Sequence, residues 1–212
     1  MLLTRLMAIA GIAAGVACAQ NNWEIGGIGG FGVARGLSLK GPAGSATPGL
    51  ANGAAIGAFG GHDTYEHWSG ELRYLYRFSD LKLSSGPTSV TFGAHSHIIH
   101  PDFLAHFTPR SSRIRPFIAF GGGVKILEGV GAESAAQPLG RFAALTRTRE
   151  TLGFADVGAG VKINLLNSLR LRVEVRDYIS PKPTKVIAPA PGATIGGALN
   201  DIIGSVAISY TF

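Results

Sequence analysis

The chain has 212 residues, of which 31 are glycine, and its 19 lysine and arginine residues exceed its 13 aspartate and glutamate residues by six. A single cysteine, Cys18, excludes an intrachain disulfide and a cysteine-rich metal cluster. The basic residues alternate with apolar ones and form no exposed run, so the net charge of +6 does not indicate a nucleic-acid-binding protein.

Residues 1–19 are expected to form a signal peptide that is removed. Arg5 precedes an apolar run from residue 6 to 16, and Ala17-Cys18-Ala19 has the small-residue form of a secretory cleavage site. The run is too short for a membrane-spanning helix. A lipoprotein acylated at Cys18 is the alternative, but the usual leucine three residues upstream is missing. We expect one mature domain over residues 20–212, exported across the inner membrane.

Alternation of large apolar and polar residues predicts strands from residue 23 onward. The first covers 23–33, with Glu24 opposed to the apolar side chains. The second, near 52–61, is rich in glycine and alanine, and its facing is ambiguous. The third, Trp68–Phe78, opposes aromatic residues to charged ones, and its aromatics are typical of an interfacial girdle.

The fourth strand is expected between Thr88 and about Phe107, with Val90 and Phe92 facing outward and a bulge where Pro101 interrupts the alternation. The fifth and sixth cover 113–127 and 154–164. The seventh, 169–176, is the clearest, because its odd positions are all aliphatic and its even positions all charged. Such a strand suits lipid on one side and a polar interior on the other.

The chain ends on an eighth alternating segment, 201–212. A closing Tyr210-Thr211-Phe212 resembles the signal that the bacterial barrel-assembly machinery reads, so Tyr210 and Phe212 are the expected assembly signal. Eight strands predict an all-β fold, an eight-stranded antiparallel transmembrane β-barrel, whose interior is filled by side chains. Outer-membrane lipid is the expected surrounding, and a monomer is favoured.

Connection lengths predict the orientation. The stretches 35–51, 128–150 and 179–200 are long and 79–88 is intermediate, whereas 62–66 and 164–168 are short. Long connections are extracellular in such barrels and short turns are periplasmic. We expect no linker to a second domain and no peptidoglycan-binding region after Phe212.

Charged residues predicted to point into the barrel form the main candidate site. They are interpreted as a structural network of ion pairs, because charges in a narrow barrel must pair or find water. Basic residues outnumber acidic ones among them, so an anion-preferring narrow pore is the alternative. The network comprises Glu71, Arg73, Arg113, Arg115, Lys125, Asp156, Lys162, Arg170, Arg172, Glu174 and Arg176, with Glu24 as a further acid and Arg77 near the rim.

Four of the six histidines, His95, His97, His100 and His106, lie close together in sequence. His95 and His97 could converge on one strand face, but Asp102 is the only carboxylate nearby, so no metal site and no cofactor are expected. A lipid-modifying hydrolase would need a base and a nucleophile on one face. His95 and Ser96 point to opposite faces, and no carboxylate in matching phase is found to activate a Ser96–His100 pair. We therefore expect no enzyme.

The pattern resembles the OmpA-like superfamily of eight-stranded outer-membrane barrels over residues 20–212. The local resemblances are Arg115-Pro116-Phe117 before a glycine-rich strand, the segment 172–178 and the terminus 210–212. The resemblance implies an outer-membrane location. It does not choose a role, because such barrels serve as anchors, adhesins or small pores. A non-catalytic structural or surface-interaction role is expected, with a narrow pore or binding barrel for small anionic solutes as the alternative and a lipid-modifying enzyme a distant third.

Overall fold

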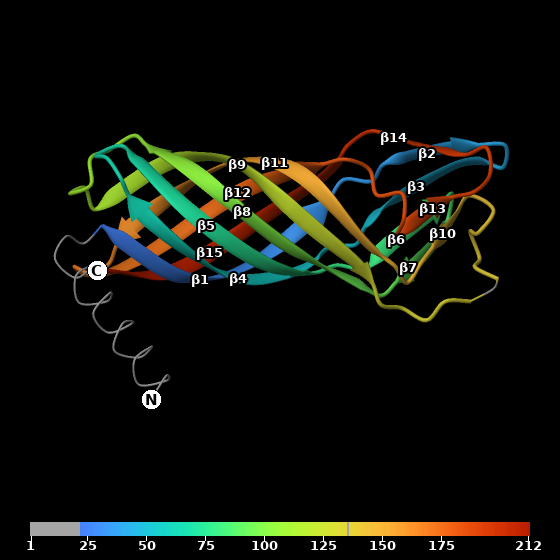
Figure 1. Cartoon of the computed structure of the whole chain (residues 1–212), viewed down its shortest axis with the longest axis horizontal. Coiled ribbons are helices and arrows are strands. Elements are labelled where there is room, and N and C mark those ends of the chain that lie inside the picture. Colours follow the sequence, from blue (N-terminus) through green and yellow to red (C-terminus); the bar gives the residue numbers. More distant parts are fainter. Residues whose placement is uncertain (1–21, 135) are drawn as a thin grey trace, which may run out of the picture.

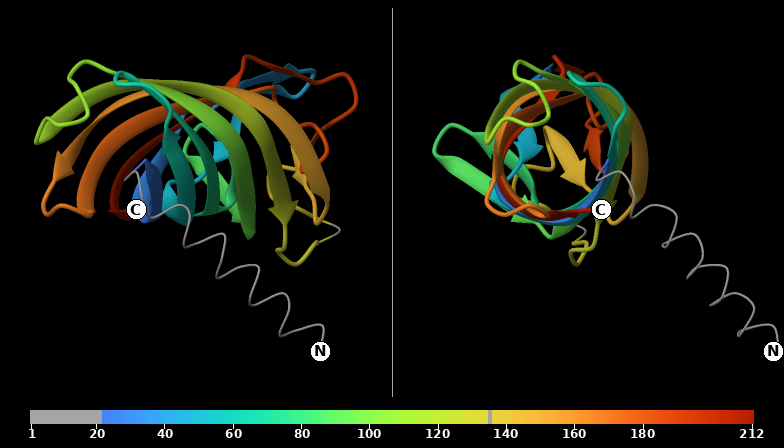
Figure 2. Two further views of the ribbon diagram at one scale, coloured as in Figure 1. Left: turned by 60° about the vertical axis from the view of Figure 1, so that its left-hand side comes forward. Right: turned by 90° about the vertical axis from the view of Figure 1, so that its left-hand side faces the viewer.

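The computed structural model describes residues 22–134 and 136–212, and eight of its strands close into one barrel (Figures 1 and 2). Every neighbouring pair is antiparallel, and β1 closes the cylinder by pairing with both β4 and β15. No described residue lies in a helix that could cross a membrane. The barrel strands are β1 (Trp23–Ala34), β4 (Gly53–Asp63), β5 (Trp68–Phe78), β8 (Ala94–His106), β9 (Ile114–Gly129), β11 (Arg149–Asn164), β12 (Leu169–Ser180) and β15 (Leu199–Thr211). The expected eight-stranded antiparallel barrel is confirmed.

The predicted facing is also confirmed along most strands. Val173 and Val175 of β12 are about half exposed, while Glu174 and Arg176, which alternate with them, are buried. Trp23 and Ile25 of β1 point outward and Glu24 inward. The barrel therefore has an apolar outside and a charged inside, the reverse of a water-soluble barrel.

The fourth strand was predicted wrongly in two respects. Val90 and Phe92 do not face outward from the barrel, because residues 88–92 form a separate short strand whose Phe92 is buried in an apolar core. No bulge occurs at Pro101, since the register on both sides of it is continuous from Ile99 to Asp102. Pro101 lies on the outward face of β8, and its pairing toward β9 is interrupted without an inserted residue.

The two ends of the barrel differ. Trp23 and Thr211 lie at one end, where the connections 64–67, 107–113 and 165–168 are short; we call it the turn end. At the other end the four long connections, 35–52, 79–93, 130–148 and 181–198, carry seven further strands and form what we call the cap (Figure 1). The cap strands are β2 (Ser38–Gly41), β3 (Gly44–Leu50), β6 (Leu81–Ser85), β7 (Thr88–Phe92), β10 (Ala143–Leu145), β13 (Ile187–Pro189) and β14 (Thr194–Gly196).

Three of the long connections build one sheet of the cap. Its order is β14-β2-β3-β6-β7. The connection before β15 (181–198) therefore pairs with the connection after β1 (35–52). That connection pairs in turn with the connection after β5 (79–93). The remaining pair, β10 and β13, joins the fourth connection, 130–148, to the connection before β15. The β6–β7 hairpin turns at Gly86, whose φ of 57° suits glycine.

An apolar core fills the cap and rests on the barrel mouth. Leu39, Leu81 and Leu145 are fully or almost fully buried, and they pack in one cluster with Ala94, Leu127 and Leu199 from the ends of barrel strands. Burying a leucine side chain contributes about 1.5–3 kcal/mol. Glu150, the second residue of β11, holds the cap to the barrel, since its carboxylate accepts backbone N–H bonds from Thr184, Lys185 and Val186 at 2.8–3.2 Å. The cap is thus a folded layer that covers the mouth.

The signal peptide expected over residues 1–19 lies outside the described residues.

Candidate functional site

The lumen holds fifteen buried charged side chains among the described residues, and all of them come from barrel strands. Alternation forces these side chains inward, because the opposite face of each strand carries the apolar residues. The basic members are Arg73, Arg77, Arg115, Lys125, Lys162, Arg170, Arg172 and Arg176, and the acidic members are Glu24, Asp63, Glu71, Asp102, Asp156, Glu174 and Asp201.

At the turn end, Glu24 and Asp63 neutralise three cations. Lys162 Nζ lies 2.7 Å from Glu24 Oε2, and Arg115 Nη1 lies 3.2 Å from Asp63 Oδ2. Arg170 Nη1 bridges the two acids at 3.4 and 3.3 Å. Ser69 Oγ donates a 2.7 Å bond to Asp63, and Ser209 Oγ donates one of the same length to Glu24. Both carboxylates are therefore shared between several donors from different strands.

The middle of the lumen is organised around Arg176. Its Nη1 contacts Asp102 at 2.6 Å and Asp156 at 3.0 Å, while Nη2 contacts Glu71 at 3.0 Å and Nε contacts Glu174 at 3.2 Å. One guanidinium thus bridges acids from four strands, which the fork of five N–H donors permits.

Two more arginines complete this middle layer. Arg73 Nη1 lies 2.5 Å from Glu174 Oε1, and Arg172 Nη1 lies 2.8 Å from Glu71 Oε2. The Arg172 guanidinium also lies over the Phe59 ring, 4.1 Å from its centroid. The Phe59 ring and the ion pairs leave Arg73 and Arg172 1% exposed or less.

Near the cap, Arg77, Lys125 and Asp201 form a third group. Asp201 accepts from Arg77 Nε at 2.9 Å and from Lys125 Nζ at 3.2 Å, and none of the three has any exposed side chain. Arg77 was expected near the rim, and it does lie at the rim, but the cap covers it. Gly32 makes room for it, because a Cβ there would stand 2.5 Å from Arg77 Cζ.

His100, Asp102 and Asp156 lie together in the middle layer. His100 Nδ1 is 2.7 Å from Asp102 and 3.4 Å from Asp156, so a carboxylate in matching phase does exist, contrary to the sequence interpretation. Ser96 Oγ nevertheless has no hydrogen-bond partner, so it is not hydrogen-bonded to His100. Ser96 is fully buried while His95 is partly exposed on the outward face, as the alternation predicts.

Arg113 is the one predicted lumen residue that the structure places elsewhere. It lies in the turn before β9 and is exposed, because the strand and its alternation begin only at Ile114. The other ten predicted members are buried together in the lumen.

The sequence interpretation also missed three lumen acids, Asp63, Asp102 and Asp201. Their parity was the available signal: Asp102 shares the face of His100, and Asp201 that of Ser205 and Ser209. With these three acids, the charged residues of the lumen are nearly balanced, eight basic to seven acidic, instead of strongly basic.

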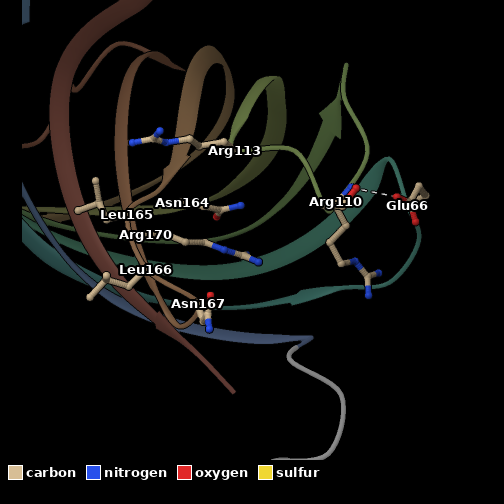
Figure 3. Close-up of a pocket in the computed structure, with 9 residues that line it drawn as sticks. Glu66, Arg110, Arg113, Asn164, Leu165, Leu166, Asn167 and Arg170 are labelled. Carbon is tan, nitrogen blue, oxygen red and sulfur yellow. Dashed lines mark hydrogen bonds between the residues drawn. The ribbon is translucent and has the colours of Figure 1, made fainter.

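A pocket of about 680 Å³ opens at the turn end, beside the ion pairs of Glu24 and Asp63. Figure 3 shows Asn164 and Arg170 on one side of it and Arg110 with Glu66 on the other. Glu66 Oε1 accepts a 2.9 Å bond from the Arg110 backbone N–H, and Arg110 Nη2 donates to Asp63 O at 2.8 Å. Arg113 also lines the pocket. The side chains of Arg110 and Arg170 already bond to neighbouring groups. The pocket is therefore a polar vestibule.

The expected assembly residues lie at the end of the last strand. Tyr210 is 54% exposed on the outward face of β15, and its ring stacks on that of Phe212 with centroids 6.4 Å apart. Phe212 follows β15 and exchanges backbone hydrogen bonds with Trp23, where the last strand meets the first.

Comparison with known proteins supports the architecture. No protein-family model matches the chain, and no curated protein matches it in sequence. Among solved structures, Neisserial surface protein A (NspA) is 12% identical, with a TM-score of 0.56, 90% of this chain and 97% of that chain covered. The outer membrane protein OprG from Pseudomonas aeruginosa is also 12% identical, with a TM-score of 0.54 and 90% and 96% covered. The chain therefore has the fold of the eight-stranded outer-membrane barrels that its sequence resembles.

Proposed function

We propose that this protein is a non-catalytic outer-membrane surface protein, in which a closed barrel holds a folded, positively charged cap toward anionic material at the cell surface. The observation that carries the proposal is the distribution of charge between the barrel and the cap. The cap connections hold seven basic and two acidic residues, whereas the barrel strands and short turns hold eleven of each.

All charged residues of the cap are exposed. The basic ones are Arg35, Lys40, Lys82, Arg141, Arg147, Lys182 and Lys185, and the acidic ones are Asp80 and Glu133. An excess of one sign on a surface attracts partners of the opposite sign at long range. Lys40 and Lys82 alternate with the buried Leu39, Leu81 and Leu83, so the same strands that fill the cap core present cations to water.

Binding of a polyanion tests the proposal. Protein refolded in neutral lipid vesicles is expected to bind dextran sulfate and not neutral dextran, with an affinity that falls as salt rises. The double variant Lys40→Gln and Lys82→Gln should weaken binding, while Arg113→Gln at the opposite end should not. Equal binding by all three proteins, or binding that salt does not affect, would contradict the proposal.

The pore alternative makes a different prediction. Anion selectivity would need excess positive charge along an open lumen, but the lumen cations have acid partners and are buried, and the cap core lies over the mouth. We therefore expect no steady current through the intact protein in planar bilayers. A steady anion-selective current would favour the pore.

A further inference from the structure

We propose that His95, His97 and Glu128 form a zinc site on the outward face of the barrel, at the rim below the cap. His95 and His97 stand two residues apart on β8, so both rings face the same side. Glu128 of β9 is the direct register partner of His95. One ligand atom from each of the three residues lies within 4.8 Å of the others.

The donor set suits this ion. Zinc is bound by imidazole nitrogen and carboxylate oxygen at about 2.0–2.2 Å, and sites with three protein ligands leave a position open for water. Such bonds hold ligand atoms roughly 3.3 Å apart. His95 Nε2 already lies 3.6 Å from Glu128 Oε2, so a small movement of the side chains would close the site.

The surrounding groups orient the ligands without using their binding atoms. Tyr74 Oη lies 2.9 Å from His97 Nδ1, and when it accepts that N–H it leaves Nε2 with a free lone pair. Arg149 pairs with Oε1 of Glu128, whereas His95 faces Oε2. The Tyr76 ring stacks on His95 with centroids 5.1 Å apart. Ligating residues of metal sites are commonly held by such a second layer of hydrogen bonds.

The position also leaves the site accessible. His95 is the second residue of β8, Glu128 the last but one of β9, and Arg149 the first of β11, so the three form a row at the cap end. All three ligands are partly exposed. The second candidate cluster, His100 with Asp102 and Asp156, differs: it is buried, and Arg176 already occupies one oxygen of each acid.

Zinc titration of the tag-free mature protein, residues 20–212, refolded in detergent micelles tests the assignment. One Zn²⁺ per chain is expected, and Co²⁺ in its place should give visible absorption bands of a nitrogen- and oxygen-ligated ion. His95→Ala or His97→Ala should each weaken binding by more than the about 10–100-fold typical of an outer hydrogen-bond partner. Tyr74→Phe should fall within that smaller range.

Matched controls use the two histidines near the turn between β4 and β5. His62→Ala and His67→Ala remove an imidazole far from the rim and should leave zinc affinity unchanged. Because the ligands point outward, the variants should keep the protease-resistant barrel, which is checked on the same samples. Zinc affinity that is unchanged in both His95→Ala and His97→Ala, or lost equally in the control variants, would overturn the proposal.

Discussion

The barrel and the cap bury opposite kinds of side chain. The lumen is filled by ion pairs around Arg176, while the cap encloses leucines such as Leu39. The outer surfaces differ in the opposite sense. Val173 and its neighbours make the barrel wall apolar, whereas the cap exposes lysines and arginines. The difference follows the solvent, since a wall facing lipid must place its charges inside and a layer facing water places them outside.

The barrel needs balanced charge and the cap does not. A buried charge without a partner is costly, so the lumen cations are matched by acids on other strands. Exposed lysines are solvated and need no partner, so the cap can hold a net positive charge. The paired charges of the lumen and the exposed charges of the cap thereby lie in two regions of one domain.

The sharpest test of this difference removes the centre of the lumen network. Arg176→Gln leaves Glu71, Asp102, Asp156 and Glu174 with one cation fewer and should lower the free energy of unfolding by about 3–5 kcal/mol. Urea unfolding in lipid vesicles, followed by tryptophan fluorescence, measures it. A loss below about 1 kcal/mol would mean that the network does not stabilise the barrel.

The corresponding change in the cap is Leu39→Ala. It should destabilise the cap by about 2–5 kcal/mol through loss of packing and formation of a cavity. Because the barrel keeps its own ladder, protease cleavage within residues 35–52 should increase while the urea transition of the barrel stays in place. If the free energy of unfolding of the barrel fell by as much as that of the cap, the two regions would unfold as one cooperative unit.

The outward wall is tested at Val173. An arginine there should cost about 2–4 kcal/mol if the residue lies near the middle of the bilayer. Val173→Thr is the control of similar shape and should cost much less. Equal tolerance of the two substitutions in the same urea titration would reverse the assigned faces.

A smaller effect is expected from crowding the group below the cap. Gly32→Ala would bring a methyl group against the Arg77 guanidinium and should cost about 1–3 kcal/mol, as overpacking does. Gly29→Ala is the matched control on the same strand, because its Cβ would meet nothing within 4 Å. Similar unfolding curves for the two variants would show that Arg77 can move aside freely.

The smallest effect is expected at Arg113, which was predicted to belong to the network but lies outside the lumen. Arg113→Gln should change the free energy of unfolding by less than about 0.5 kcal/mol, as exposed substitutions usually do. The same urea titration measures it. A loss comparable with that of Arg176→Gln would place Arg113 in the lumen after all.

Alternation along the sequence predicts the eight barrel strands, the facing of most of them and most of the lumen residues, but none of the seven cap strands. Alternation is a local property, so Leu169–Arg176 reveals both faces of β12 without knowledge of its neighbours. The prediction was wrong at Arg113, which lies in a turn beyond the alternating segment, and at Val90 and Phe92, which alternate but belong to a strand of the cap.

Which charges pair and what the long connections build both depend on the way the strands come together in space. Arg73 meets Glu174 across 101 residues of sequence, and Arg77 meets Asp201 across 124, because barrel closure and strand register set their heights in the lumen. The cap sheet takes its strands from three separate connections, each too short to bury an apolar face alone. The register likewise brought Glu128 beside His95, a pairing that no spacing along the chain could indicate.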